Sequence, residues 1–153
     1  MKVVQVHDKD RKSAITLKVM EALPEWFSPP EDVRRKAQTH RGFAFFAAEE
    51  GGEVVGFAAI KRHNPYTAEL YTIGVRKEYH RRGAGKRLLN ACEEWCRGEG
   101  LVCLTVKTLD GSADYPPYDG TRAFYRRQGF IPLEVFPTFW DEENPCLFLA
   151  KML

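Results

Sequence analysis

Residues 75–89, VRKEYHRRGAGKRLL, decide how this sequence is interpreted. A strand pattern ends at Val75, a loop with glycines at positions 83 and 85 follows, and the apolar stripe of a helix begins at once. The first N–H groups of a helix have no partner within the helix and carry positive partial charge, and glycine lets a ligand approach the backbone. Only Glu78 opposes the cations in or beside the loop, which are Arg76, Lys77, Arg81, Arg82, Lys86 and Arg87. The stretch therefore predicts a polyphosphate site, because the alternative, a solvated basic turn, explains the charges but not the spacing of the glycines.

Two common phosphate-binding loops do not fit this stretch. A P-loop needs Ser or Thr after Gly-Lys and a further glycine five residues before its second one. Here Arg87 follows Lys86, and the residue five positions before Gly85 is His80. A dinucleotide-binding loop needs a third glycine where this chain has Leu88. Both readings are therefore disfavoured.

The loop instead resembles motif A of the GNAT acetyltransferase family, Gln/Arg-x-x-Gly-x-Gly/Ala at a strand–loop–helix junction. The matching stretch is HRRGAG at residues 80–85, in which His80 departs from the usual Gln or Arg. The residues Ile-Gly-Val at 73–75 match the segment before it, and AFYRRQGF at residues 123–130 is similar to the second signature of the family. Together the matches cover about residues 53–130.

The resemblance implies an N-acetyltransferase that moves the acetyl group of acetyl-CoA to a primary amine, by direct attack through a tetrahedral intermediate and without a metal. It implies that the strand residues Ile73, Gly74 and Val75 face the pantetheine arm, and that a backbone N–H near Val75 polarises the thioester carbonyl. Motif A would wrap the pyrophosphate with Arg81, Arg82, Gly83, Ala84, Gly85 and Lys86. The strand that carries Gly74 would splay from the next strand and leave a V-shaped slot.

The chemistry also needs an acid and a base. An alkylammonium group has a pKa of about 10.4, so a base must remove a proton near neutral pH, and the departing thiolate needs a proton donor. The resemblance places Tyr125 at the family's acid position, beside the cofactor. For the base we expect Glu69, at the start of the strand that approaches the thioester. Weaker alternatives are Glu53, His63, Asp110 and a water relay without a dedicated base.

The rest of the chain predicts a mixed α/β domain. Apolar runs at residues 43–49 and 53–61 around Gly51-Gly52 predict a hairpin, with residues 54–60 as a buried central strand. Alternation in the strand at 68–75 puts Glu69, Tyr71, Ile73 and Val75 on one face. Further strands are expected at residues 3–6, 101–107, 130–136 and 146–152, and helices at 13–23, 31–39, 84–97 and 121–128. Residues 109–120 form a long loop, which favours a functional role.

This order, βααβββαβαββ, predicts a central mixed sheet of six to seven strands with about four helices, in a single GNAT-like domain over residues 1–153. Segments outside the two signatures would recognise the acceptor. Aromatic residues near turns could wall its pocket, namely Trp26, Phe27, Phe139 and Trp140, with acids to attract a cation at Asp141, Glu142 and Glu143. Packing in the core or a lid is the alternative role for each of them.

Composition limits the other function classes. The 153 residues carry a formal net charge of +2, so no global charge favours a nucleic-acid or membrane partner. The chain has no long apolar segment, and its four cysteines are too few for a disulfide scaffold. We therefore expect a cytoplasmic protein, monomeric or homodimeric, whose partners are acetyl-CoA and an amine acceptor. The alternative function is a non-catalytic acyl-CoA sensor or regulatory module.

Overall fold

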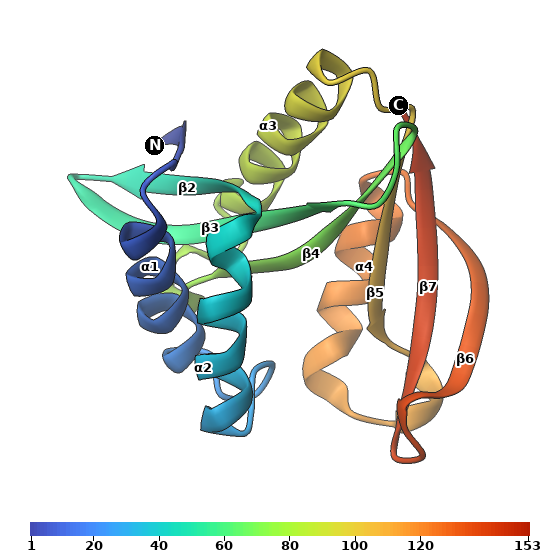
Figure 1. The fold of residues 1–153 in the computed structure, drawn as a ribbon. Coiled ribbons are helices and arrows are strands. Elements are labelled where there is room, and N and C mark those ends of the chain that lie inside the picture. Colours follow the sequence, from blue (N-terminus) through green and yellow to red (C-terminus); the bar gives the residue numbers. More distant parts are fainter.

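The computed structural model describes residues 1–153, which form one seven-stranded sheet with four α-helices packed on it (Figure 1). The first half of the chain contains β1 (Lys2–Gln5), α1 (Lys9–Glu21), α2 (Pro30–Thr39), β2 (Ala44–Glu50), β3 (Glu53–Arg62) and β4 (Thr67–Val75). The second half contains α3 (Ala84–Gly98), β5 (Cys103–Leu109), α4 (Asp119–Arg127), β6 (Ile131–Asp141) and β7 (Asn144–Met152). Short 3₁₀ turns lie at His40–Gly42, Lys77–Tyr79, Gly111–Ala113 and Pro116–Tyr118. The predicted fold class and element order are confirmed.

The sheet has the strand order β1-β2-β3-β4-β5-β7-β6, and only the β4–β5 pair is parallel. Helices cover both of its faces. Residues of α3 pack with β3, β4 and β5 in one apolar cluster, while α1 and α2 pack with β2 and β3 in a second cluster on the other face. Residues 55–60 of β3 are therefore buried, as the apolar run predicted. None of the helices combines the length and apolar character needed to cross a membrane.

The sheet divides between β4 and β5. Residues 67–70 of β4 pair with residues 103–106 of β5, and the pairing ends at Leu70 and Val106. Beyond this point β4 stays with β3, and β5 stays with β7. Figure 1 shows β2, β3 and β4 crossing the molecule while β5, β7 and β6 run in a different direction. This divergence creates the predicted V-shaped opening.

A bulge in β4 overturns one prediction about its faces. Ala59 pairs with Thr72 and Ile60 pairs with Leu70, so Tyr71 is an extra residue without an opposite partner. An extra residue in one strand reverses the alternation of the side chains beyond it. Glu69 and Tyr71 therefore share a face as predicted, and this face is the α1–α2 side, but Ile73 and Val75 pack on the opposite side, against the α3 cluster.

Several boundaries also differ from the prediction. Helix α1 begins at Lys9 rather than at residue 13, and β5 is shifted two residues toward the C-terminus. Strand β6 continues to Asp141, through residues expected to form a linker, because the Asp141 carboxylate accepts hydrogen bonds from the N–H groups of Glu143 and Asn144 and closes a tight turn. Glu93 of α3 is buried despite its charge and pairs with Lys151 at 2.9 Å.

Candidate functional site

The N-terminus of α3 is uncapped. Its first helical hydrogen bond runs from the N–H of Arg87 to the carbonyl of Gly83, so the N–H groups of Ala84, Gly85 and Lys86 have no partner within the helix. No side chain caps this end. Gly83 adopts a left-handed conformation with φ of 83°, and Arg81 does so with φ of 62°. The turn thus presents free N–H groups in the way that an anion requires.

The charges around this turn are more balanced than the sequence suggested. The fold brings Glu50 to within 3.7 Å of Arg82, whose guanidinium also lies over the Tyr79 ring. Glu25 pairs with Lys77, and Arg76 lies 3.8 Å from Glu53. The expectation that only Glu78 opposes the loop cations was therefore wrong. Arg81, Lys86 and Arg87 have no acidic partner, and these three remain free for an anionic ligand.

The three glycines of the site play different parts. A Cβ at Gly83 would meet no atom within 4 Å, so the space above it is open. A Cβ at Gly85 would come within 3.2 Å of the Phe124 ring, so this glycine allows α3 to approach α4. Gly74 faces Val19 and Leu23 of α1, and its carbonyl points toward β3. Gly74 therefore packs under α1, and its contact with the cofactor stays a prediction.

The edge of β4 that faces the opening offers backbone groups. The N–H of Arg76 donates to the Val55 carbonyl of β3, 2.9 Å away. Successive residues of a strand direct their backbone groups to alternate edges, so those of Ile73 and Val75 face the opening between β4 and β5. His80, the unusual first residue of motif A, donates from Nε2 to the Val75 carbonyl at 2.6 Å. This contact fixes the end of the open edge beside the α3 turn.

Two buried side chains with hydroxyl groups lie on the α3–α4 side of the opening. Thr108 lies on β5 just past the last β4–β5 pair, and its buried hydroxyl has no hydrogen-bond partner. Tyr125 is 4% exposed and packs edge-on against Phe124 and Phe130. Burial, with a smaller contribution from Tyr118, raises the pKa of the Tyr125 hydroxyl, so this group keeps its proton at neutral pH.

Glu69 lies on the opposite face, in contact with two basic groups. Its Oε1 atom accepts hydrogen bonds from His63 Nε2 at 2.7 Å and from Lys107 Nζ at 3.0 Å. Both contacts use Oε1, so Oε2 has no partner within the chain. The Glu69 side chain is 8% exposed and that of His63 is 34% exposed, which connects the buried carboxylate to solvent through the imidazole. The structure thus joins two of the predicted alternatives, Glu69 and His63, in one cluster.

A cavity of about 450 Å³ adjoins this cluster, and we name it the hairpin cavity. Phe136, Phe139 and Phe148 of the β6–β7 hairpin form its apolar wall, and Thr105 and Lys107 of β5 lie on its sheet side. Lys107 directly follows Val106, the last β5 residue that pairs with β4. The cavity therefore lies beside the paired part of β4 and β5 and reaches, at Lys107, the point where the two strands separate.

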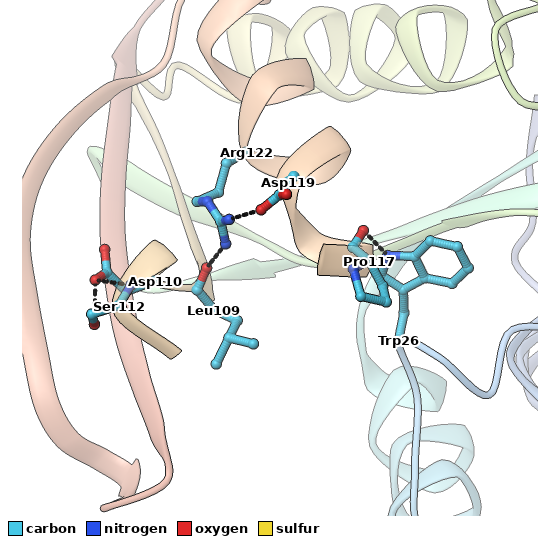
Figure 2. A network of polar contacts seen from close by, with 7 residues as sticks. All are labelled: Trp26, Leu109, Asp110, Ser112, Pro117, Asp119 and Arg122. Carbon is cyan, nitrogen blue, oxygen red and sulfur yellow. Dashed lines mark hydrogen bonds and ion pairs between the residues drawn. The ribbon is translucent and has the colours of Figure 1, made fainter. Parts of the chain in front are cut away.

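Residues 110–118, expected to be a loop, tie the two halves of the sheet together, and we name them the strap. The Trp26 indole N–H donates to the Pro117 carbonyl at 2.9 Å, and the Tyr118 hydroxyl donates to the Trp26 carbonyl at 2.7 Å. Figure 2 shows the Trp26 contact and, on the other side of the strap, Arg122 reaching the Leu109 carbonyl. Because the Trp26 ring also packs against His80, it spans from the strap to the α3 turn.

The other predicted alternatives for the base and the acceptor pocket are placed elsewhere. Glu53 lies near Lys18 and Arg76 in ion pairs at the surface. The Ser112 hydroxyl and N–H bind Asp110 and lower the pKa of that carboxyl, so it holds a proton poorly (Figure 2). Of the four aromatic residues expected at the acceptor pocket, only Phe139 lines the hairpin cavity; Phe27 packs against Gly74.

The sequence interpretation missed Lys107 and Thr108. Both belong to β5, and their neighbours on the two faces depend on which β4 residue stands beside each of them. The pairing of Glu69 with Thr105 sets this register, and it puts Lys107 on the Glu69 face and Thr108 on the α3–α4 face. The available clue in the sequence was Lys107, because a charged residue two positions before the end of a buried strand needs a polar partner.

Comparisons with known proteins agree with this fold. The model of the acetyltransferase (GNAT) family matches residues 12–130. N-alpha-acetyltransferase RimI of Mycobacterium tuberculosis is 37% identical over 106 residues, which cover 67% of this chain and 60% of that protein. A Desulfovibrio desulfuricans protein assigned to the GNAT family superposes with a TM-score of 0.83 at 22% identity, covering 98% of each chain. An aminoglycoside 6'-N-acetyltransferase complexed with coenzyme A superposes with a TM-score of 0.76 at 18% identity, covering 99% of this chain and 97% of that one.

The matches to the first two curated relatives span 60% and 61% of their lengths, so each relative has residues that this chain does not match. The structural similarities, at these low identities, show the fold. The family model, by contrast, matches most of the chain and includes the α3 turn, the β4 edge and Tyr125. On this evidence the chain belongs to the GNAT acetyltransferase family.

Proposed function

We propose that this protein is an N-acetyltransferase that transfers the acetyl group of acetyl-CoA to a primary amine. One observation carries the proposal. The Glu69 carboxylate near the end of the paired part of β4 and β5, the open β4 edge and the uncapped α3 turn follow one another along the chain, and this order suits an amine, an amide-containing arm and a diphosphate. The similarity to RimI, named as an N-alpha-acetyltransferase, supports the same activity.

The chain has groups that fit acetyl-CoA. The open space above Gly83 and the free N–H groups of Ala84, Gly85 and Lys86 suit the diphosphate, with Arg81 and Lys86 as countercharges. The N–H groups of Ile73 and Val75 suit the carbonyls of the pantetheine arm. The unpartnered Thr108 hydroxyl, buried beside the same opening, suits a further polar atom of that arm. When bound, the cofactor supplies the acetyl thioester.

Glu69 acts as the base in this proposal. Its free Oε2 takes a proton from the acceptor ammonium, and His63, bonded to Oε1 and partly exposed, passes the proton to solvent. Lys107 holds the carboxylate in place through its contact with Oε1. The amine is then neutral, with its lone pair directed toward the opening from the hairpin cavity.

Tyr125 acts as the acid. Its proton is retained at neutral pH and goes to the departing sulfur. The N–C bond forms first, and the C–S bond breaks as the resulting tetrahedral intermediate collapses. Of the two protons that the ammonium group loses, one leaves through Glu69 and the other replaces the proton that Tyr125 donated. Glu69 and Tyr125 approach the opening from opposite faces of the sheet, so the acid and base stay separate.

The test is release of free thiol from acetyl-CoA in the presence of a panel of primary amines. We expect acetyl-CoA to bind and thiol to appear with at least one amine. Glu69→Gln should reduce kcat about 100-fold or more while leaving the affinity for acetyl-CoA nearly unchanged. Glu94→Gln, on α3, is the matched control and should behave as the parent. Tight binding of acetyl-CoA with no acetyl transfer to any amine would instead favour the acyl-CoA sensor.

A further inference from the structure

The hairpin cavity also carries information about the acceptor, provided that the proposed acetyl transfer is correct. Ionisable side chains line the cavity at two positions, Lys107 and His63, and both are basic or neutral. No carboxylate lines the cavity. Glu69 lies behind these two residues, and its side chain is only 8% exposed. Any charged ligand group that contacts the cavity wall directly therefore meets cations rather than anions.

The polar groups of the cavity are mainly hydrogen-bond donors. Lys107 has three N–H donors, and one of them is used by Glu69. Oδ1 of Asn64 accepts hydrogen bonds from the N–H groups of Tyr66 and Thr67, so these bonds leave the NH₂ group of Asn64 unused as a donor. Thr67, whose side chain has a hydroxyl group, also lines the cavity. Unused donors of this kind favour a ligand rich in acceptor atoms, and a carboxylate satisfies two donors at once.

Lys36 adds a further cation on the same face. It projects from α2 over the Tyr71 ring, 5.5 Å from the ring centre, and has no ion-pair partner. Burial lowers the pKa of Lys36, while Asp32 and Glu69 oppose this effect. Three cationic or potentially cationic groups, Lys36, Lys107 and His63, thus surround the single carboxylate of Glu69.

The rest of the cavity is apolar. Phe136, Phe139 and Phe148 contribute three phenyl rings, and two of these rings face the Lys107 ammonium at 5.4 and 5.6 Å. A volume of about 450 Å³ accommodates one small molecule rather than a folded partner. The ligand that fits both the wall and the donors has a compact apolar body with a carboxylate beside it.

We propose that the hairpin cavity binds the acceptor, and that the acceptor is a small aminocarboxylate with an apolar side chain, such as a free aromatic or branched amino acid. Lys107 and Asn64 bind its carboxylate, and the phenylalanine rings enclose its side chain. Its ammonium group passes a proton through a water molecule to Oε2 of Glu69, which lies behind the cavity wall. The acetyl group then passes to that nitrogen, with the proton balance given above.

The experiment compares three acceptors that share a phenyl ring and a primary amine: L-phenylalanine, L-phenylalaninamide and 2-phenylethylamine. We expect kcat/KM for L-phenylalanine to exceed both others about tenfold or more, because only it carries the carboxylate. The amine of L-phenylalaninamide is less basic than that of L-phenylalanine, so a larger fraction of it is neutral at a given pH. Amine basicity alone would therefore favour the amide over L-phenylalanine. Calorimetry can also measure the binding of L-phenylalanine to the complex of the protein with coenzyme A, and this readout is independent of turnover.

Variants of Lys107 test whether its ammonium group binds the carboxylate of the acceptor. Lys107→Met should lower kcat for all three acceptors by a similar factor, because Lys107 also holds Glu69 in place. It should in addition raise the KM of L-phenylalanine and so remove its advantage over 2-phenylethylamine, whereas Lys107→Arg should keep part of that advantage. A merely structural role of Lys107 would impair all three acceptors equally. Lys2→Met, at an exposed position, is the matched control.

Two outcomes would overturn the inference, and they are distinguishable. If 2-phenylethylamine or a polyamine such as spermidine is acetylated with the same kcat/KM as L-phenylalanine, the proposed acetyl transfer stands and the proposed aminocarboxylate acceptor is wrong. If acetyl-CoA binds and no amine of any kind is acetylated, the proposed function itself fails. Equal binding of L-phenylalanine to the parent and to Lys107→Met would also exclude the carboxylate site.

Discussion

Among single residues, Thr108 has a buried hydroxyl that the folded chain leaves without a partner. Such a group costs about 1–3 kcal/mol unless a ligand supplies the missing hydrogen bond. Thr108→Val should therefore raise the free energy of unfolding of the ligand-free protein by about 1 kcal/mol and weaken acetyl-CoA binding. Denaturant unfolding and calorimetry measure the two effects. Thr108→Ser, which keeps the hydroxyl, should retain the affinity, and unchanged affinity of the Val variant would remove Thr108 from the cofactor site.

Tyr125 provides a second test at this scale. Tyr125→Phe should lower kcat about 100-fold or more and leave the dissociation constant for acetyl-CoA nearly unchanged, because only the proton donor is lost. Since burial raises the pKa of Tyr125, the parent should show no loss of rate from its ionisation up to pH 10. The exposed Tyr66→Phe is the control. A Tyr125→Phe variant with full turnover would show that its hydroxyl is not the acid.

At the scale of elements, α3 offers a matched pair of glycines. Gly83 precedes the helix with φ of 83°, and Gly100 follows it with φ of 77°, and a Cβ would meet open space at both. Valine at either position should cost about 1–2 kcal/mol of stability through its left-handed conformation. Only Gly83→Val should also abolish acetyl-CoA binding, because its side chain would fill the anion space. Thermal unfolding with and without acetyl-CoA separates these effects; a ligand-induced stabilisation that persists in Gly83→Val would contradict the assigned anion site.

The elements also show where sequence interpretation succeeded and failed. The β2–β3 hairpin, the amphipathic α3 and the order of the strands follow from local patterns, because glycine turns and apolar periodicity act over a few residues. The bulge at Tyr71 does not, since it is defined only by the pairing of β4 with β3. One inserted residue moved Ile73 and Val75 to the other face. The contact of Glu69 with Lys107 was equally hidden, because the β4–β5 register joins segments 38 residues apart.

At the scale of the whole molecule, the proposed site lies where the two halves of the sheet separate, and it draws residues from both. The half formed by β1 to β4 contributes Glu69 and the open strand edge, and the half formed by β5, β7 and β6 contributes Lys107 and the phenylalanine wall. The net charge of +2 does not reveal this arrangement, because cations and acids are paired locally around the α3 turn. The division of the sheet, rather than the overall composition, determines where a ligand can enter.

His40 joins the α1–α2 layer to the sheet and makes the stability of the molecule dependent on pH. It is fully buried between Thr16 and Thr72. The Thr16 hydroxyl donates to the Lys12 carbonyl, so it accepts from Nδ1 of His40, and Nε2 accepts from Thr72. Both contacts are therefore made by the neutral imidazole. Burial, with a smaller effect from Lys36, lowers the pKa of His40 from 6.5 to about 3.

This lowered pKa fixes the sign of the pH effect. Below pH 6.5 the unfolded chain binds a proton at His40 that the folded chain refuses, so the stability present above pH 6.5 is lost as the pH falls toward 3. Between pH 7 and 5 this residue alone should lower the free energy of unfolding by about 2 kcal/mol. Urea unfolding at a series of pH values measures the slope. His40→Gln should be less stable at pH 7 but lose this component of the slope, whereas the exposed His7→Gln should keep it. Parallel pH profiles for the parent and His40→Gln would show that the folded protein accommodates a protonated His40, which the two threonine contacts argue against.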